Sequence, residues 1–318
     1  MDKTKKKEAS VSSALSAGLF QLPFYPMTYV KVLIQAGHEP LPPFRSRSLF
    51  GREQFFYPNN FSYMRYIYSV EGLTGLYRGI GMKIISHSVA TFVYDKVNLM
   101  LEETEQIEQE EKKDKNDDKF IVFIKQSSKE ITARCWGVVF SHPFHVMGLR
   151  CMAQFIGGET AYSSWNIFHN ISEIYRSEGV LGFFSGLIPR LLFEASTIAL
   201  TSSLAYLIKT YIYEDKDIDA LIDLFSSLIS NSITYPLSVV STISCISGSA
   251  LMAARPPRML LYSSWIDIFR NLYENNELKR GASSFFRVYQ PPNILQATGF
   301  SLGQVPTNRA QKYLSKSE

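Results

Sequence analysis

The stretch "SHPFHVMGLRCM" (residues 141–152) places a proline inside an apolar segment, and the same arrangement occurs twice more in the chain. It corresponds to "FYPMTYVKVLIQ" (24–35) and "TYPLSVVSTISC" (234–245), each with proline at its third position. A proline inside a helix removes one backbone hydrogen bond and bends the helix. Three such segments, spaced by roughly 100 residues, predict a fold built from three tandem units.

Two further sequence repeats support three units. "YSSWNIF" (162–168) recurs as "YSSWIDIF" (262–269), and "YSVEGLTGLYRG" (68–79) matches "YRSEGVLGFFSG" (175–186) without a gap. Each unit is predicted to contain a proline-bearing apolar helix, a loop and a shorter surface helix. The first two units then add a second apolar helix.

These patterns predict both the elements and the division of the chain. We expect membrane-crossing helices at 11–36, 82–101, 120–156, 189–212 and 218–248, and surface helices at 60–70, 164–177 and 263–275. The predicted parts are a basic tail (1–10), a first repeat (11–101), a charged linker (102–119), a second repeat (120–212), a truncated third repeat (213–288) and an irregular tail (289–318). The linker carries mixed charge without an apolar period, which predicts a solvated loop.

Composition and charge favour an integral membrane protein. Residues 9–30 and 224–254 contain no Asp, Glu, Lys or Arg, and charge-free runs longer than about 18 residues are typical of membrane spans. The net charge of +4 includes no basic stripe beyond "KTKKK" (3–7), so nucleic acid is not an expected partner. The three cysteines lack CxxC spacing, which indicates a reducing compartment rather than a disulfide framework.

The third unit is predicted to lack its second helix. After "GASSFFR" (281–287), two adjacent prolines at 291 and 292 and another at 306 leave no stretch long enough to cross a bilayer. The five remaining helices each carry polar residues at helical spacing. These stripes are Gln21, Thr28, Lys31 and Gln35; Lys83, His87, Thr91 and Asn98; Arg134, Ser141 and His145; Glu194, Thr197 and Thr201; and Ser227, Asn231, Thr234, Ser238 and Ser241 or Thr242.

The stripes predict a bundle around a hydrated interior. A charge near the bilayer centre costs roughly 2.5–3.5 kcal/mol, so Lys31 and Glu194 are expected to face water or each other. Without a sixth helix, the polar interior would open sideways as a lateral groove.

The repeats resemble the mitochondrial carrier superfamily, which has three units of two helices and a Pro-x-acid-x-x-base motif on each odd helix; the motif prolines are Pro26, Pro143 and Pro236. The chain is still more similar to the divergent outer-membrane branch, the mitochondrial carrier homologs. The stretches that carry this similarity are "YVKVLIQAGHEPLPP" (29–43), "HPFHV" (142–146), "QFIG" (154–157), "GFFSGLIPRLL" (182–192), "SLAYL" (203–207), "TYP" (234–236), "YSSWID" (262–267) and "RGASSFFR" (280–287). The resemblance reaches to about residue 288 and implies an all-α, multi-pass protein of the mitochondrial outer membrane.

The carrier gate is altered. The acid positions hold Thr28, His145 and Ser238, and the base positions hold Lys31, Gly148 and Ser241. A gate needs opposite charges whose pairing differs in free energy between two states. Because only Lys31 is charged, we expect alternating-access transport to be lost.

The resemblance implies an insertase that passes tail-anchored and other α-helical proteins into the outer membrane. Carried over by motif, the groove positions are Lys31, Glu194, Tyr235 and Thr242, and the stripes add Thr28, His145, Asn231 and Ser238 as client-binding residues. The expected partners are hydrophobic client helices and membrane lipids. The alternatives are a docking receptor for a pro-apoptotic Bcl-family protein that uses an exposed loop such as 102–119, a lipid scramblase, and a divergent solute carrier.

Several of these residues also have a purely structural interpretation. Lys31 could snorkel to the interface, Glu194 could pair with Arg190, and the polar residues of 218–248 could form interhelical hydrogen bonds. Arg190 and Arg287 are expected to bind lipid phosphates or to cap helix ends. His142 and His145 lack a third metal ligand, and the chain contains no GxxxxGK[ST], GxGxxG, GxSxG or HExxH. We therefore expect no metal, no cofactor and no enzymatic activity.

Overall fold

The computed structural model describes residues 22–47, 51, 53–111, 119–211 and 218–289. The predicted basic tail, the start of the first helix and the C-terminal tail from residue 290 lie outside the described residues. The helical elements are η1 (Leu22–Phe24), α2 (Tyr25–Gln35), α3 (Asn60–Gly75), α4 (Ile80–Glu111), α5 (Lys119–Gly157), α6 (Ile167–Glu178), η2 (Val180–Phe184), α7 (Leu187–Tyr211), α8 (Asp219–Ile246), η4 (Met252–Ala254) and α9 (Trp265–Glu274). The strands are β1 (Phe44–Arg47), β2 (Glu53–Tyr57) and β3 (Arg287–Val288).

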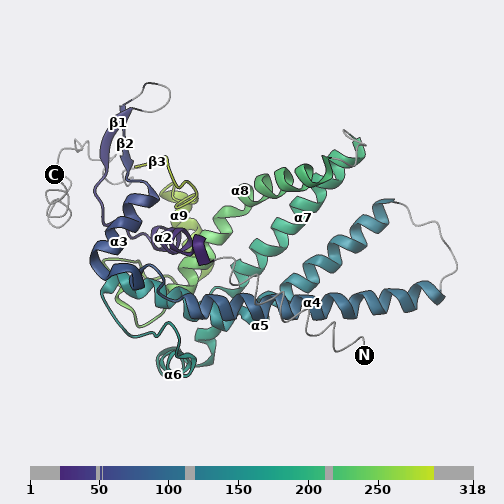
Figure 1. The fold of residues 1–318 in the computed structure, drawn as a ribbon, viewed down its shortest axis with the longest axis horizontal. Coiled ribbons are helices and arrows are strands. Elements are labelled where there is room, and N and C mark those ends of the chain that lie inside the picture. The colour runs from purple at the N-terminus through teal and green to yellow at the C-terminus, as the bar shows by residue number, and fades with distance from the viewer. Residues whose placement is uncertain (1–21, 48–50, 52, 112–118, 212–217, 290–318) are drawn as a thin grey trace.

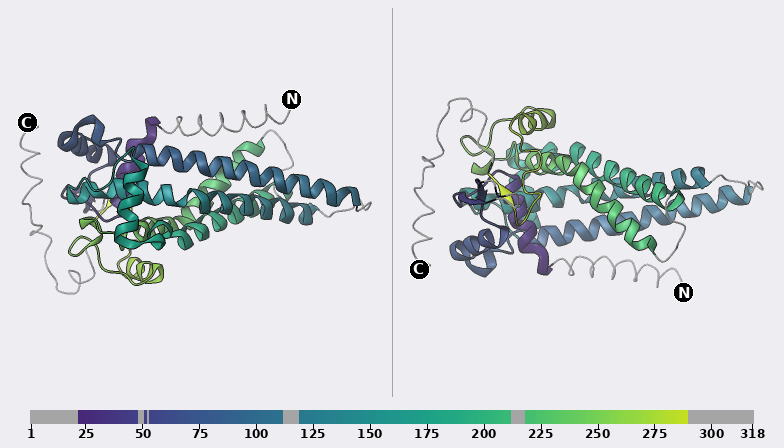
Figure 2. Two further views of the ribbon diagram at one scale, coloured as in Figure 1. Left: turned by 90° about the horizontal axis from the view of Figure 1, so that it is seen from below. Right: turned by 90° about the horizontal axis from the view of Figure 1, so that it is seen from above.

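The long helices pack in chain order. α4 lies along α5, α5 along α7 and α7 along α8, while the short α2 contacts both α5 and α8 (Figure 1). The surface helices α3, α6 and α9 gather at one end of this bundle, as the two views of Figure 2 also show. The mostly helical, carrier-like architecture is therefore confirmed.

Each surface helix begins at a polar cap and buries one side. The side chains of Asn59, Asn166 and Ser264 accept hydrogen bonds from the backbone N–H groups of Ser62, His169 and Asp267, respectively, at 2.9, 3.1 and 3.3 Å. Such caps satisfy N–H groups that have no partner within the helix. The buried residues are spaced by four: Tyr63 and Ile67 in α3, Asn170 and Ile174 in α6, and Ile268 and Leu272 in α9.

Three arginines join the repeats at this end of the bundle. Each arginine donates to a backbone carbonyl at or just beyond the C-terminal end of one of the three proline-bearing helices, α2, α5 or α8. Each arginine also pairs with a glutamate. The sets are Arg78 with Glu159 O and Glu71, Arg150 with Cys245 O and Glu178, and Arg280 with Gln35 O and Glu277. Carbonyls at a helix C-terminus have no intrahelical partner and carry partial negative charge. The three contacts therefore link repeat one to two, two to three, and three to one.

The all-α prediction is wrong in one respect, because the chain contains a three-stranded antiparallel sheet. β1 pairs with β2, and β2 pairs with β3, so that Phe44 and Val288 both lie opposite Phe56. The carrier resemblance led us to expect helices alone, and these short β-strands lie in segments that the resemblance treats as loops.

The path of the chain after α9 positions the third repeat. The chain turns at Gly281, which has a φ of 78°, a left-handed conformation that glycine adopts without steric cost. It then enters β3 and pairs with repeat one instead of returning along α8. Arg287 holds this strand by pairing with Glu39 and donating to the Pro58 carbonyl at 3.0 Å. Arg287 thus makes a contact within the protein, where we had expected a lipid or helix-end contact.

The prediction of a solvated loop at 102–119 is wrong for most of its length. α4 continues to Glu111 and α5 begins at Lys119, while residues 112–118 lie outside the described part. Glu and Gln are good helix formers, so the segment extends a helix although it has no apolar face. With 32 residues, α4 is about 48 Å long at 1.5 Å per residue.

By length and hydropathy alone, one described helical stretch, Val180–Tyr211, could cross a membrane. The other long helices interrupt their apolar residues with charges or with serine, threonine and asparagine. The prediction of five spans therefore stays a prediction.

Candidate functional site

The C-terminal half of α2 meets α8 through a buried hydrogen-bond network. Gln35 Nε2 donates to Tyr235 Oη at 3.0 Å, and Thr242 Oγ1 donates to Gln35 Oε1 at 3.0 Å. Tyr235 Oη in turn donates to the Arg280 carbonyl at 3.0 Å. Since all three side chains are buried, the network fixes repeat one against repeat three.

Lys31 lies on the same contact. Its Nζ is 4.9 Å from the centroid of the Tyr235 ring, within the range of a cation–π interaction. This contact orients the ammonium group of Lys31 against α8. Tyr235 and Thr242 thus support Lys31 and the α2–α8 contact, and their role in client binding stays a prediction.

A second group of charges comes from α4 and α7. Lys83 interacts electrostatically with Arg190, with Glu194 and with Lys31 of the first group. Arg190 and Glu194 stand one helical turn apart on α7 and also interact electrostatically. Within the described residues, however, neither Arg190 nor Glu194 takes part in an ion pair.

Arg190 is positioned by a histidine. Arg190 Nη1 lies 3.2 Å from His142 Nδ1, and His142 Nε2 lies 2.9 Å from the Ser185 carbonyl oxygen. A carbonyl only accepts and a guanidinium only donates, so Nε2 must carry the proton and Nδ1 must accept. This arrangement requires a neutral His142 in one tautomer.

His145 lies next to this pair, with its ring centroid 6.0 Å from that of His142. It interacts electrostatically with Arg190 and Lys83. His145 therefore lies near Arg190 and Lys83, and its role in client binding stays a prediction.

The remaining predicted groove residues bond within their own helices. Thr28 Oγ1 donates to the Phe24 carbonyl at 3.4 Å, and the Asn231 side chain, which is exposed, donates to the Ser227 carbonyl at 2.8 Å. The Ser238 carbonyl accepts from Thr242 at 3.0 Å. These residues thus form no side-chain hydrogen bond with another helix among the described residues.

Interhelical hydrogen bonding accounts for part of the α8 stripe. Thr234 Oγ1 lies 2.7 Å from Thr197 Oγ1 of α7, and Ser241 Oγ donates to the Gly186 carbonyl at 3.2 Å. The stripe therefore divides into residues that join α8 to α7 and residues, such as Asn231, that stay exposed.

The sequence analysis placed Lys83 and Gln35 on the polar stripes, but it named neither of them, nor His142, as a client-binding residue. A comparison of repeats one and two would have indicated Lys83. Lys83 in "RGIGMK" and Arg190 in "SGLIPR" both stand four residues after a glycine, and that glycine directly precedes α4 in repeat one and α7 in repeat two. Gln35 and His142 depend on contacts between repeats, which periodicity does not indicate.

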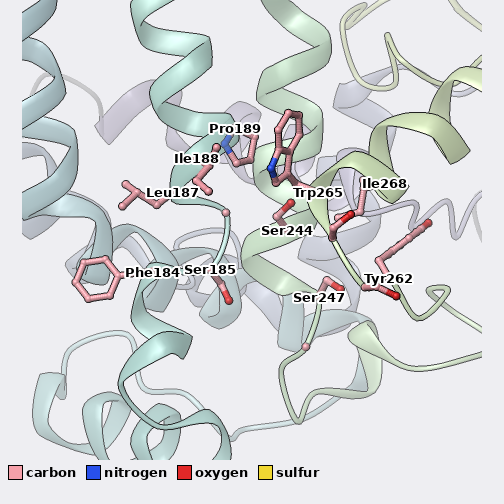
Figure 3. A pocket seen from close by; sticks show the side chains of 14 residues that line it. Phe184, Ser185, Leu187, Ile188, Pro189, Ser244, Ser247, Tyr262, Trp265 and Ile268 are labelled. Atoms are coloured by element: carbon pink, nitrogen blue, oxygen red, sulfur yellow. The ribbon is translucent and has the colours of Figure 1, made fainter.

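A cavity of about 260 Å³ lies beside this region, where η2 and the start of α7 meet the end of α8 and α9 (Figure 3). Its wall includes Ser185, Ser244, Ser247, Tyr262 and Trp265. None of the predicted groove residues lines it. The cavity is therefore separate from the charged group, although Ser185 contributes to both.

Comparison with known proteins gives consistent relatives. The sequence profile of the family described as "Mitochondrial carrier protein" matches residues 6–104 and 123–216. The chain is 36% identical over 288 residues to mitochondrial carrier homolog 2 of Homo sapiens, covering 88% of this chain and 94% of that protein. It is 32% identical over 296 residues to mitochondrial carrier homolog 1 of Mus musculus, covering 86% and 75%. The mitochondrial thiamine pyrophosphate carrier of Homo sapiens is 28% identical over 179 residues, 53% of each chain.

Proposed function

Because this chain belongs to the mitochondrial carrier family, and within it to the mitochondrial carrier homologs, we propose that it is an insertase of the mitochondrial outer membrane. It passes tail-anchored and other α-helical proteins into the bilayer along a polar groove on the side of the bundle. The family consists of membrane transporters rather than enzymes, which agrees with the lack of enzyme motifs in the sequence.

The observation that carries the proposal is the path of the chain after α9. In a carrier unit, a second membrane helix follows the surface helix. Here the chain turns at Gly281 and runs into β3 on repeat one. Asn231 of α8 is exposed, and within the described residues its side chain bonds only to its own helix.

An open polar face suits insertion on physical grounds. A hydrophobic helix enters a bilayer spontaneously, but the polar flank that must cross with it is costly to dehydrate. Polar and charged side chains that reach the edge of the bundle would hold water beside the lipid and lower that cost. No energy source is required.

Solute transport by alternating access is a weaker candidate. The three acid and three base positions of the carrier gate hold one charged residue, Lys31, which contacts the Tyr235 ring instead of a carboxylate. Lipid scrambling would use the same polar face, with a headgroup in place of a peptide flank, and is compatible with insertion.

The test is insertion of a fluorescently labelled tail-anchored helix into liposomes, with and without the purified protein. The wild type should accelerate insertion, and Lys31→Glu and Glu194→Arg should both change the rate. Arg176→Glu is the matched control, because Arg176 is an exposed cation on α6, outside the bundle. No acceleration by a correctly folded wild-type protein would refute the proposal, and unchanged rates in both groove variants would refute the site.

A specific observation favours a second role, that of a docking receptor. α4 is about 48 Å long, against a hydrocarbon core of about 30 Å, so the end that includes Glu102–Glu111 would project from the membrane beside the start of α5 (Figure 1). A Bcl-family protein is the partner that the resemblance suggests. Deleting residues 102–118 should abolish its recruitment to liposomes while leaving helix insertion intact, and retained recruitment would refute this role.

A further inference from the structure

Three cations from three helices share the interior with one carboxylate. Lys31 of α2, Lys83 of α4 and Arg190 of α7 interact electrostatically through Lys83, and Glu194 is the acid coupled to this group. Among the described residues, no carboxylate lies within ion-pair distance of any of the three cations. The group therefore carries a surplus of two positive charges.

Two other cations of the long helices have carboxylate partners. Arg150, the fully buried cation of α5, makes two hydrogen bonds to Glu178, at 2.5 and 2.7 Å. At the opposite end of the bundle, Lys209 pairs with Asp223 at 2.8 Å. Arg150 and Lys209 are thus neutralised within the protein, whereas the Lys31–Lys83–Arg190 group is not.

The cations are available to a ligand. Arg190 makes one side-chain hydrogen bond within the described protein, to His142, and the neutral His142 ring adds no negative charge. The side chain of Lys83 makes no hydrogen bond within the described residues, and Lys31 contacts a ring face. A charge in a membrane interior is stabilised by water or by a counter-charge, so a passing anion would be attracted to this group.

We propose that the Lys31–Lys83–Arg190 group selects clients by the charge of the flank that crosses the membrane, favouring carboxylates and opposing ammonium or guanidinium groups. This inference rests on the proposed insertase function. The recognised chemistry is a carboxylate of the client polypeptide, either an acidic side chain or the C-terminal carboxylate that a tail-anchored helix carries across. Basic flanks are repelled by the same charges and cross more slowly.

The test uses one labelled hydrophobic helix with three C-terminal flanks, rich in Glu, Gln or Lys, and zwitterionic phosphatidylcholine vesicles. For each flank, the readout is the ratio of the insertion rate with the protein to the rate in protein-free vesicles. This ratio removes the difference in spontaneous insertion rate between the three clients. Two uncompensated charges acting on one flank charge about 20 Å away, at an effective dielectric constant near 20, predict a preference on the order of a hundredfold for the Glu flank over the Lys flank. The preference should decrease at 0.5 M KCl, since salt screens the interaction.

Lys83→Glu is the decisive variant, because the side chain of Lys83 has no hydrogen bond to lose among the described residues and the change removes the surplus. It should reduce the Glu-to-Lys preference to about one, whereas Arg176→Glu, with the same change in net charge, should leave the preference unchanged. Equal acceleration of all three flanks, or an unchanged preference in folded Lys83→Glu, would overturn the charge filter while leaving the insertase proposal intact. A preference that appears only in vesicles with anionic lipid would also overturn it, since the lipid surface would then be the selector. No acceleration of any flank would count against the insertase function itself.

Discussion

Replacing Tyr235 by phenylalanine should loosen the contact between repeats one and three. The hydroxyl of Tyr235 accepts from Gln35 and donates to the Arg280 carbonyl, and phenylalanine keeps the ring under Lys31 while removing both bonds. Each hydrogen bond contributes about 1 kcal/mol net, and a buried amide left without an acceptor costs about 1–3 kcal/mol. The expected loss in the free energy of unfolding is about 2–3 kcal/mol, which corresponds to a fall of about 3–5 °C in melting temperature for a chain of this size.

The buried cysteines provide the assay. Cys151 and Cys245 are fully buried, so a thiol-reactive fluorogenic dye reports unfolding in detergent micelles as their thiols become exposed. Tyr273→Phe is the matched control, because Tyr273 lies on α9 with 67% of its surface exposed and should melt like the wild type. A double variant that adds Gln35→Leu should lose less than the sum of the two single changes, because both remove the same bond. A Tyr235→Phe protein that melts within about 2 °C of the wild type would refute the network as the lock between α2 and α8.

Three further predictions concern stability and use the same melting assay. Arg150→Met should destabilise the protein by about 3–5 kcal/mol because it leaves Glu178 without its buried partner. Arg150→Lys should restore only part of the loss, because an ammonium does not form the two parallel bonds of a guanidinium. Arg176→Met, at an exposed position, is the control, and equal melting temperatures of the two Met variants would contradict this account. Gly186→Ala should reduce the free energy of unfolding by about 1–3 kcal/mol more than Gly158→Ala. Both glycines have positive φ, but only at Gly186 would a Cβ lie 2.8 Å from a backbone oxygen, that of Ser241. Similar losses in the two variants would show that the close approach of α7 to α8 is unimportant. Burial, reinforced by the positive charge of Arg258, lowers the pKa of His38 to about 4, so the folded protein binds fewer protons than the unfolded chain and the contribution of His38 is lost as pH falls below 6.5. Between pH 7.5 and 5 the wild type should lose about 2 kcal/mol relative to His38→Phe, which keeps the ring packing on Tyr63 and Phe155; the difference between the two proteins isolates His38 from Glu39, whose pKa burial raises to about 7, and parallel pH profiles would contradict the assignment.

The helices and their order were predictable because they depend on local periodicity. The proline-bearing segments, the "YSSW" stretches and the polar stripes each lie within one helix or one turn, and helices occur at these positions in the described residues. Where local signals competed, the prediction was wrong. The charged stretch after residue 101 has no apolar face, yet its Glu and Gln residues continue α4 as far as Glu111.

Only the tertiary structure decided how the repeats meet and what the polar residues contact. Helical spacing put Lys31, Gln35 and Thr242 on the inner faces of two helices, and the family resemblance added Tyr235. Neither indicated that Gln35 bonds to both Tyr235 and Thr242 while Lys31 covers the Tyr235 ring. The strand pairing of residues 287–288 with residues 56–57 joins segments more than two hundred residues apart, and no local pattern encodes such a partner. A sequence determines which face of each helix is polar because that depends on a 3.6-residue period. Which polar group lies opposite another depends on the packing of separate helices, and within the described part of the chain this packing also leaves Lys31, Lys83 and Arg190 without a carboxylate at ion-pair distance.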